Sequence, residues 1–422
     1  MSLGALPALA FAVARTPQSA LVAHEEDGAR CWSVCTLGPA LYTAEGCDTA
    51  LAGFAAALDA RFTAHRGPVD PLWALGWVSY DAAREAADPR ERRDPRPPRD
   101  SLAAACIVPV VARATTQTWP PVWRVSGPGS AALDAMLKAR EAPESDFDAA
   151  FALPPEAEHR ARVEAIKALI RDGEVYLVNL AERLFAPHGP TDRDTAAFLA
   201  RCFAKARPAR GMLLNLGAHR VAAMTMERAL TWDRQARRAV SEPIKGTRPR
   251  ALDDPEADRR AAQALAESPK ERAENAMAVD VHRNDLGRVA TVGGVSVPSL
   301  FRTEAHAFVH HLVSTVEAEV PQNLSAFEML QSVLPVGSVT GAPKLAAFDV
   351  ISALEAHRRG LYTGALATLG SDGSLDASVV IRTLVDDEAG LHYGVGGGIV
   401  YDSVAAEEYA ELGWKVRALR RG

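Results

Sequence analysis

Strand-like and helix-like stretches alternate irregularly along this 422-residue chain, without the regular strand, helix, strand rhythm of a parallel doubly wound sheet. Apolar residues recur at helical spacing over 163–170 and stop at Asp172 and Gly173, which predicts a helix. β-Branched, apolar runs at 102–113 and 289–297 predict buried strands. The order of these stretches favours an α+β fold.

Two segments are poor in periodic apolar pattern and rich in proline and charge. Residues 88–100 are predicted to form an exposed loop, and residues 142–157 are predicted to form a linker. We therefore expect an N-terminal region at 1–141, the linker, and a C-terminal region at 158–422. A chain of this length allows two or three average domains or one large sheet-based core.

The charge of the chain argues against nucleic acid as its main partner. The formal net charge is -6 and the isoelectric point is near 6.0, whereas binding to a phosphate backbone needs a basic face. The five cysteines lack the paired spacing of a disulfide framework or a structural zinc site. No run is long enough to span a membrane, and the apolar residues 1–13 lack the basic start of a signal peptide. We expect a cytoplasmic protein with no membrane or nucleic-acid partner.

The strongest chemical signal is the run PIKGTRPR, from Pro243 to Arg250. A lysine amine becomes nucleophilic when burial and neighbouring cations favour its neutral form, and arginines follow Lys245 in this run. Its prolines restrict φ, and Gly246 lets a ligand approach the backbone. The run therefore predicts a shaped loop with cationic walls for a small anionic substrate. A solvated basic surface loop is the alternative.

Two pairs of glutamates suit a hard divalent cation. A capping-box pattern with proline at the first helical position starts a helix at 268–271, so Glu271 and Glu274 fall on one helix face. A second predicted helix, beginning near residue 403, places Glu408 and Glu411 on one face. Mg²⁺ prefers carboxylate oxygens and keeps water and substrate oxygens in its shell. The pairs therefore predict a Mg²⁺ site, although a closed capping box and solvated surface charges would explain each pair separately.

Further blocks follow the lysine run in a fixed order: SPKERAE at 268–274, VDVHRNDLGRV at 279–289, HLVS at 311–314, GSVTGAPK at 337–344, IRT at 381–383 and GGGIV at 396–400. Together they resemble the aminodeoxychorismate synthase component I branch of the chorismate-utilising family, which also contains anthranilate, isochorismate and salicylate synthases. The resemblance extends over about 174–415 and, before that, only over GWVSYD at 76–81. It implies two large antiparallel sheets packed face to face with helices outside, to which the N-terminal region also contributes.

The resemblance also implies roles for individual residues. Lys245 matches the covalent nucleophile of this branch, Glu227 matches the general acid, and His311 matches the active-site histidine. The positions that match the Mg²⁺ site are Glu271, Glu274, Glu408 and Glu411, with Glu274 and Glu411 as direct ligands and the other two acting through water. The positions that match substrate-binding residues are Gly246, Thr247, Ser338, Tyr362, Arg382, Gly396, Gly397, Gly398 and Lys415. Because chorismate carries two carboxylates, a guanidinium and a cradle of backbone amides are the expected anchors.

Two departures from the family pattern bear on activity. Leu177 stands where amino-transferring members usually have glutamine and where water-adding members have a lysine base. Leucine cannot activate water, which disfavours water as the nucleophile. Asn275 stands where the family usually has histidine.

The sequence thus predicts a Mg²⁺-dependent enzyme that converts chorismate and ammonia to 4-amino-4-deoxychorismate for p-aminobenzoate and folate synthesis. No segment of it resembles a glutaminase, so a separate glutamine amidotransferase subunit is the expected source of ammonia. Anthranilate synthase component I is the first alternative, although the tryptophan-sensing Leu-Leu-Glu-Ser run of its feedback-inhibited members is not found. A catalytically inactive, chorismate-binding homologue is the second alternative.

Overall fold

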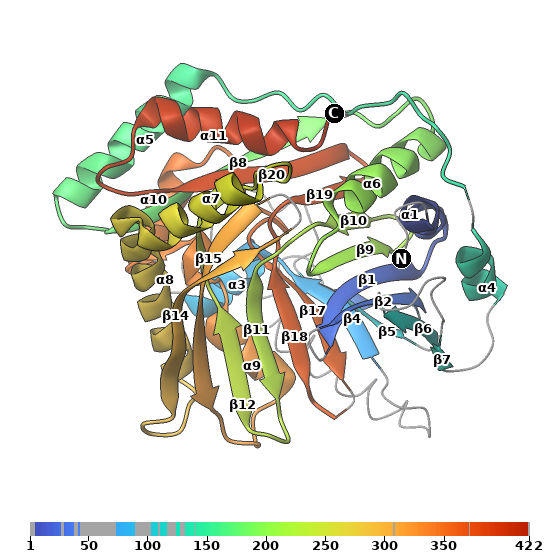
Figure 1. Cartoon of the computed structure of the whole chain (residues 1–422), viewed down its shortest axis with the longest axis horizontal. Coiled ribbons are helices and arrows are strands. Elements are labelled where there is room, and N and C mark those ends of the chain that lie inside the picture. Colours follow the sequence, from blue (N-terminus) through green and yellow to red (C-terminus); the bar gives the residue numbers. More distant parts are fainter. Residues whose placement is uncertain are drawn as a thin grey trace.

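The computed structural model describes residues 5–26, 29–37, 41–42, 73–88, 103–108, 110–115, 124–126, 131–139, 141–306, 309–370 and 372–420. Within these ranges the strands form two sheets (Figure 1). Every pair of neighbouring strands described there is antiparallel. The chain is therefore an α+β protein built on antiparallel sheets, as predicted.

The first sheet joins strands from both ends of the chain. Its strands, in spatial order, are β16 (Gly341–Ala342), β8 (Leu177–Ala186), β20 (Gly390–Ile399), β19 (Thr383–Asp387), β10 (Arg220–Ala223), β9 (Gly211–Asn215), β1 (Ser19–Glu26), β2 (Ala29–Thr36), β6 (Val110–Thr115) and β7 (Arg124–Ser126). The first and last thirds of the chain therefore contribute strands to one hydrogen-bonded sheet.

The second sheet is assembled in the same way. Its strands, in spatial order, are β13 (Ile244–Pro249), β15 (Val309–Glu319), β12 (Arg238–Glu242), β11 (Arg228–Asp233), β18 (Leu375–Val379), β17 (Ala365–Gly370), β4 (Trp73–Val78), β5 (Ala103–Val108) and β3 (Leu41–Tyr42). Strand β14 (Val295–Ala305) pairs with β15 outside this order.

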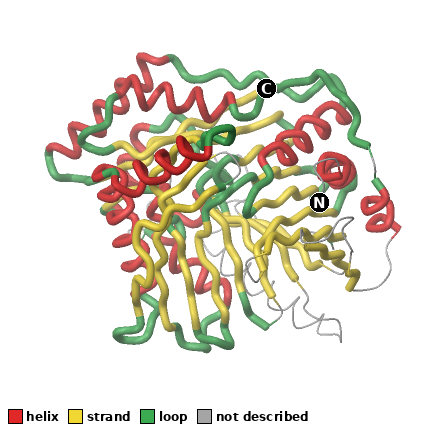
Figure 2. The backbone as a smooth tube through the Cα atoms, in the orientation of Figure 1, coloured by secondary structure: helices red, strands yellow, loops and turns green. Residues whose placement is uncertain are grey.

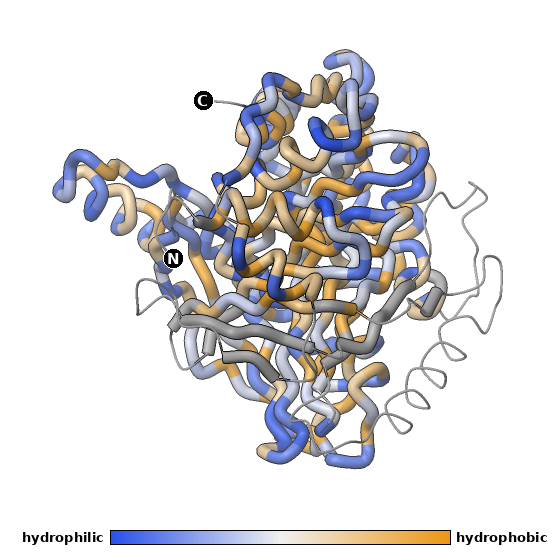
Figure 3. Tube along the Cα trace, turned by 90° about the vertical axis from the view of Figure 1, so that its right-hand side faces the viewer, coloured by the Kyte–Doolittle hydropathy of each residue, from blue (hydrophilic) through white to orange (hydrophobic). Residues whose placement is uncertain are grey.

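The two sheets pack face to face. One buried cluster takes Val22 and Met212 from the first sheet and Trp77 and Leu366 from the second. Alternate side chains of each strand point to this shared interior, which is the usual core of a sandwich of sheets. Figure 3 shows the hydrophobic residues gathered inside the molecule and the hydrophilic ones at its outer turns.

Helices cover the outer faces of both sheets (Figure 2). Those whose side chains join core clusters with the first sheet are α1 (Ala5–Arg15), α4 (Ala131–Lys138), α5 (Glu156–Arg171), α6 (Asp192–Ala206), α10 (Lys344–Leu354) and α11 (Ala405–Arg417). Those that pack on the second sheet are α3 (Tyr80–Ala87), α7 (Pro255–Glu267), α8 (Pro269–Gly287) and α9 (Ala326–Val333). Among the described residues, no helix is both long and apolar enough to cross a membrane.

The sequence predicted a helix correctly but two strands incorrectly. The helix predicted at 163–170 lies in α5, which ends before Gly173 at φ 80°. The single strand predicted at 102–113 is wrong, because β5 and β6 belong to different sheets and the chain changes sheet between them. The strand predicted at 289–297 is also wrong over its first part: a turn with Gly293 at φ 74° precedes β14.

The segment predicted as a linker has no helix or strand at 141–155. It nevertheless packs against the protein, because Phe151 is only 5% exposed and its ring contacts that of Tyr393 in a tilted arrangement, with ring centroids 5.8 Å apart. Helix α5 then begins at Glu156. Of the loop predicted at 88–100, only Asp88 lies within the described residues.

Candidate active site

The nucleophile predicted from the sequence lies against the glycine run of β20. Lys245 lies on β13 and is half-buried. A Cβ atom placed on Gly398 would lie 3.3 Å from Lys245 Nζ and 3.5 Å from Leu177 Cδ1. The amine therefore points at the glycine run of β20, beside an apolar wall formed by Leu177. This glycine leaves room for a ligand where any other residue would place a side chain.

The predicted general acid lies within the electrostatic reach of this amine. Glu227 immediately precedes β11 and is only 4% exposed. Ser338 Oγ donates a hydrogen bond to Glu227 Oε1 at 2.5 Å, and the Glu227 amide donates to Thr225 Oγ1. Burial raises the pKa of Glu227, while the Ser338 bond and the charge of Lys245 oppose that shift. The carboxyl is thus biased toward its protonated form, which a proton donor requires.

The cationic wall predicted around Lys245 is not what the structure shows. Arg248 is exposed, and Arg250 binds Asp258 through Nη2 to Oδ2 at 2.8 Å. The charge of Lys245 acts on the carboxyls of Glu227 and Glu274 and on one cation from another element, Lys415 on α11. Extended strand β13 carries the arginines past the site, so a local run of basic residues does not make a local basic wall.

One predicted acidic pair projects from the start of α8. The Ser268 hydroxyl caps this helix by accepting from the Glu271 amide, as the capping pattern predicts. Glu271 lies against the lysine loop, because a Cβ on Gly246 would lie 2.9 Å from Glu271 Oε2. Burial raises the pKa of Glu274, Lys245 lowers it, and Glu271 raises it further. The pair therefore faces Lys245.

The second acidic pair lies on α11, across from the first. A Cβ on Gly397 would lie 3.1 Å from Glu408 Oε2, so this carboxylate borders the glycine run. Burial raises the pKa of Glu408, the Ser403 hydroxyl opposes the shift, and Glu411 adds to it. Glu411 is 53% exposed on its side chain and binds Lys415 Nζ at 2.6 Å. Although burial opposes it, Lys415 holds the pKa of Glu411 below its ordinary value.

The donor chemistry of these glutamates fits a magnesium ion held partly through water. Glu408 raises the pKa of Glu274, so the two helices bring their carboxylates within repelling distance. Within the described ranges, however, no three acidic, histidine or cysteine side chains are close enough to hold a metal ion as they stand. Hydrated Mg²⁺ bound by one or two carboxylates needs no closed cage.

Two of the predicted substrate-binding residues contact the predicted active-site histidine. Thr247 Oγ1 lies 3.0 Å from His311 Nδ1, and strand β13 pairs Thr247 with His311 on β15. Burial first of all, and then the nearby His306, lower the pKa of His311 to about 4. His311 is therefore neutral near pH 7. Gly246 adopts φ 89°, a conformation that favours glycine, and it turns the chain between Lys245 and Thr247.

The predicted arginine anchor has an unusual backbone conformation. Arg382 adopts φ 51°, and its carbonyl accepts from the Met224 amide at 3.2 Å. Burial is the main cause of the raised pKa of Tyr362, and the charge of Arg382 opposes this shift. The Tyr362 ring lies on the backbone of Gly394, because a Cβ there would be 2.1 Å from Tyr362 Cγ. A non-glycine residue in the left-handed backbone region is strained, and the surrounding structure must stabilise this conformation.

The triple glycine is part of a strand rather than a turn. Gly396, Gly397 and Gly398 on β20 pair with residues of β8, whereas β19 pairs with β20 only as far as Tyr393. Past that point, alternate residues of the described strand direct their N–H and C=O groups to an open edge. The Gly396 carbonyl accepts a hydrogen bond from Lys415 Nζ. Lys415 therefore closes this edge from α11.

The structure thus brings the predicted residues together from β13, β15, β20, α8 and α11. It also reveals supporting residues that the sequence did not single out. Lys344 Nζ binds both carboxylate oxygens of Asp285, at 2.8 and 2.7 Å. This pair ties α10 to α8. Both residues lie in the quoted blocks at 337–344 and 279–289, but block membership alone does not reveal that they bind each other.

The departure at Asn275 has a structural explanation. Asn275 is fully buried on α8, its Nδ2 donates to the Leu312 carbonyl at 3.0 Å, and its Oδ1 accepts from Ser314 Oγ at 2.5 Å. The amide supplies a donor and an acceptor at once. Asn275 therefore anchors α8, next to Glu274, onto β15.

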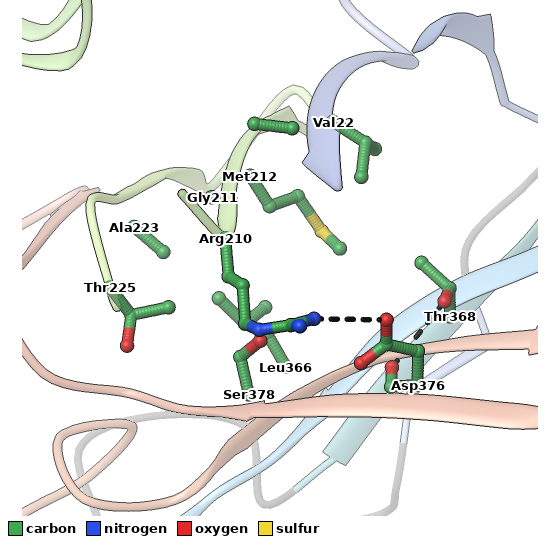
Figure 4. A pocket seen from close by; sticks show the side chains of 11 residues that line it. Val22, Arg210, Gly211, Met212, Ala223, Thr225, Leu366, Thr368, Asp376 and Ser378 are labelled. Carbon is green, nitrogen blue, oxygen red and sulfur yellow. Dashed lines mark hydrogen bonds and ion pairs between the residues drawn. The ribbon is translucent and has the colours of Figure 1, made fainter. Parts of the chain in front are cut away.

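A separate cavity lies between the two sheets and contains none of the predicted site residues (Figure 4). Arg210 points into it, and its Nη1 binds Asp376 Oδ2 at 3.3 Å. Met212, Leu366 and Val22 form part of its apolar lining. This ion pair links the two sheets across the core.

Comparison with known proteins gives a consistent result. The sequence pattern of chorismate binding enzymes matches residues 25–421. The chain is 41% identical over 264 residues to aminodeoxychorismate synthase component 1 of Klebsiella aerogenes, covering 62% of this chain and 57% of that protein. It is 40% identical over 262 residues to anthranilate synthase component 1 of Thermus thermophilus, covering 61% of this chain and 55% of that protein. The matched part thus spans little more than half the length of these relatives.

The fold has a solved counterpart. Anthranilate synthase component I from Streptococcus pneumoniae superimposes with a TM-score of 0.71 at 23% identity, covering 97% of this chain and 91% of that one. At this identity the likeness concerns the fold alone. It confirms the predicted pair of large antiparallel sheets with helices outside.

Proposed function

The chain belongs to the chorismate-binding enzyme family, and we propose that within it the protein converts chorismate and ammonia to 4-amino-4-deoxychorismate. One observation carries this choice. A primary amine, Lys245 Nζ, faces the glycine edge that is proposed to hold the substrate. Beside it lies Glu227, a buried carboxyl biased toward its protonated form. A nucleophile and a proton donor within electrostatic reach of each other support replacement of a ring hydroxyl.

In the first proposed step, Lys245 Nζ attacks C2 of chorismate. The ring double bonds shift, the bond from C4 to its hydroxyl oxygen breaks, and Glu227 protonates that oxygen so that it leaves as water. Arg382, His311 and Thr247 anchor the carboxylates. Glu274 and Glu411 would hold a magnesium ion directly, Glu271 and Glu408 would act through water, and the ion would supply positive charge for a substrate carboxylate.

In the second step, ammonia adds at C4, the double bonds shift back, and the bond between C2 and Lys245 Nζ breaks. The enolpyruvyl group is retained, and the net reaction consumes ammonia and releases water. Leu177 supports this sequence of events. Its apolar side chain borders the same space as Lys245 Nζ, so it offers water no base and leaves the lysine as the first nucleophile.

Ammonia is proposed to come from a separate glutamine amidotransferase subunit, which would transfer the glutamine amide nitrogen for p-aminobenzoate and folate synthesis. The support is the name of the Klebsiella aerogenes relative, which is a component 1. Glutamine alone should therefore give no product with the purified chain, and a cognate amidotransferase should restore synthesis. Glutamine-dependent turnover by the purified chain alone would contradict this assignment.

Anthranilate synthesis is the second candidate, and the 40% identity to the Thermus thermophilus relative favours it. It would add ammonia at C2 and eliminate pyruvate. A lysine amine already directed at the substrate space would obstruct that position.

Product analysis separates the two candidates. Purified protein is incubated with chorismate, Mg²⁺ and ammonium, and products are identified by mass and fluorescence. The proposal predicts a C4-amino product without pyruvate release. Fluorescent anthranilate with stoichiometric pyruvate would refute it, and chorismate binding without turnover would indicate an inactive homologue.

A further inference from the structure

A buried arginine behind the substrate site uses its whole guanidinium to join neighbouring segments. Arg359 and Glu355 are each 2% exposed on their side chains, and Arg359 Nη2 lies 2.6 Å from Glu355 Oε1. Arg359 Nε also donates to Glu355. A buried pair of this kind seldom adds much net stability, because desolvation offsets the attraction between the charges. Its geometry therefore calls for another explanation.

The remaining donors of Arg359 bind three separate segments. Nη1 donates to the Val339 carbonyl at 2.8 Å and to Thr363 Oγ1 at 3.1 Å, and Nη2 donates to the Asn179 carbonyl at 2.6 Å. Glu355 Oε1 accepts from the Ala181 amide at 2.9 Å. All five N–H groups of the guanidinium thus have acceptors.

Each bound segment carries a predicted substrate residue immediately beside the contact. Val339 follows Ser338, which binds Glu227, and Thr363 follows Tyr362. Asn179 pairs with Gly398 across the ladder from β8 to β20. The Arg359 guanidinium therefore binds next to three predicted substrate positions and fixes their relative places, and the Arg359 carbonyl accepts from the Tyr362 amide at 3.2 Å.

Thr363 shows that this arrangement is under strain. It is a fully buried, β-branched residue at φ 61°, a conformation that such residues rarely adopt. Its amide donates to the Val380 carbonyl at 2.7 Å, and its hydroxyl accepts from Arg359. These bonds hold a backbone conformation that directs Tyr362 toward Gly394 and Arg382.

Two residues of the N-terminal region, Tyr80 and Asp81, also contact this network. The Arg359 guanidinium lies 4.5 Å from the ring centroid of Tyr80. The Gly360 amide donates to Asp81 Oδ2 at 2.9 Å, and the Tyr80 amide donates to the Gly360 carbonyl at 2.9 Å. These two residues end the GWVSYD block, and they lie where α3 begins after β4 (Figure 1).

The end of β4 also lies close to the segment that follows Arg359. A Cβ on Gly364 would lie 2.2 Å from the Val78 carbonyl oxygen, so the end of β4 and the segment 359–364 run in direct backbone contact. Because the two segments are closely packed, a displacement of one would also displace the other.

We propose that Arg359 and Glu355, held from the N-terminal side by Tyr80 and Asp81, are positioning residues that set the affinity of the site for chorismate. This inference rests on the proposed substrate site but not on which product is formed. Loss of the network should weaken chorismate binding more than it slows the bound substrate's reaction, because the hydrogen bonds of the Arg359 guanidinium go to residues beside the substrate positions and none of those described above goes to Lys245 or Glu227.

The test measures chorismate affinity by calorimetry in the presence of Mg²⁺, together with KM and kcat. Arg359→Lys keeps a charge opposite Glu355 but loses the planar fork of donors. We expect its dissociation constant and KM to rise roughly 10-fold to 100-fold, a range typical of small misplacements in a site, with kcat changed less. The matched control is Arg210→Lys, which alters another buried arginine paired with a carboxylate, in the separate cavity.

Tyr80 tests the N-terminal contribution and remains informative if Arg359→Lys does not fold. Within the described residues the Tyr80 hydroxyl has no hydrogen-bond partner, so Tyr80→Phe keeps the ring contact and should bind chorismate as the wild type does. Tyr80→Leu removes the ring and should weaken binding. Equal affinities for the Leu and Phe variants, or a folded Arg359→Lys variant with wild-type affinity, would overturn the proposal. A wild-type protein that binds no chorismate would overturn the proposed function and this inference together, whereas an unexpected product would overturn only the former.

Discussion

The two sides of the proposed site differ in how their acidic groups are satisfied. On the nucleophile side, Glu227 is buried but has a protein donor, Ser338, and the cation Lys245 beside it. On the opposite side, Glu274 and Glu408 are partly buried, and burial is the main cause of their raised pKa values; Glu408 raises the pKa of Glu274 further, and Glu411 raises that of Glu408. On the first side a cation and a hydroxyl donor act on one carboxyl, whereas on the second side the lysines present leave the pKa values of Glu274 and Glu408 raised.

This difference indicates which chemistry each side performs. A carboxyl with an internal donor and a raised pKa can deliver a proton without outside help. Carboxylates that repel one another gain stability when a cation binds between them. The comparison is therefore consistent with the proposed function, in which proton transfer and covalent chemistry belong to the Lys245 side and cation binding to the side formed by α8 and α11.

The largest effect is expected from removing a charge on the cation side. Glu274→Gln and Glu411→Gln preserve side-chain size but remove a hard anionic ligand, so turnover should fall by about three orders of magnitude or more without unfolding. Activity is measured as a function of Mg²⁺ concentration. Glu407→Gln, an exposed residue on the same helix α11, serves as the control. A variant at position 274 or 411 with wild-type rate and Mg²⁺ dependence would show that its residue is not a direct ligand.

On the nucleophile side, Lys245→Ala should bind chorismate and Mg²⁺ but lose C4 amination by roughly two to three orders of magnitude. Lys245→Arg is the matched variant, because it keeps the charge near Glu227 but cannot act as the nucleophile at neutral pH. Both variants should be similarly slow. Recovery of activity by the arginine variant would reduce Lys245 to an electrostatic anchor.

Glu227→Gln should lower kcat by about two orders of magnitude, the usual contribution of a general acid. Since Glu227 must be protonated, the wild-type rate should be present below its folded pKa and lost as pH rises through that value. Burial raises this pKa above the ordinary 4.5. The glutamine variant should lack this descending limb, and a limb that persists unchanged would assign it to another group.

Apparent Mg²⁺ affinity should be weaker at low pH by a moderate factor. Glu274 and Glu408 have raised pKa values, so protons compete with the cation as pH falls through those values. Titrations of Mg²⁺ at pH 5 and pH 8 measure this competition. A pH-independent affinity would contradict the assignment of these two residues to the cation side.

The smallest effect should come from Ser338→Ala, with a rate loss of about tenfold or less. The Ser338 hydrogen bond lowers the pKa of Glu227. Its removal should therefore shift the descending limb of the pH profile to higher pH. A limb that moves to lower pH would show that Ser338 does not stabilise the Glu227 anion.

The sequence predicted the spacing of the acidic pairs well, but it predicted the surroundings of Lys245 poorly. The acidic pairs were predictable because helical spacing alone places Glu271 with Glu274 and Glu408 with Glu411. The surroundings of Lys245 were not, because the strand conformation of β13 carries Arg248 and Arg250 away, and charged groups from other elements, among them Glu227, Glu274 and Lys415, lie near the amine. Local spacing specifies neighbours within an element, whereas contacts between elements depend on the fold.

The same limit applies to the fold. The helix at 163–170 follows from its own apolar periodicity. The run at 102–113 could not reveal that β5 and β6 enter different sheets, because both halves are equally apolar and the choice of partner strands is not local. The role of Arg359 was hidden for the same reason, since its acceptors lie at residues 179, 339 and 363.

The central claim, that Lys245 is a covalent nucleophile, is tested most directly by intact-mass analysis of the protein trapped with chorismate and Mg²⁺ in the absence of ammonia. The account predicts an adduct with the mass of chorismate less one water, mapping to Lys245 after proteolysis and absent from Lys245→Ala. Absence of any adduct in the wild type, together with undiminished C4 amination by Lys245→Ala, would contradict it.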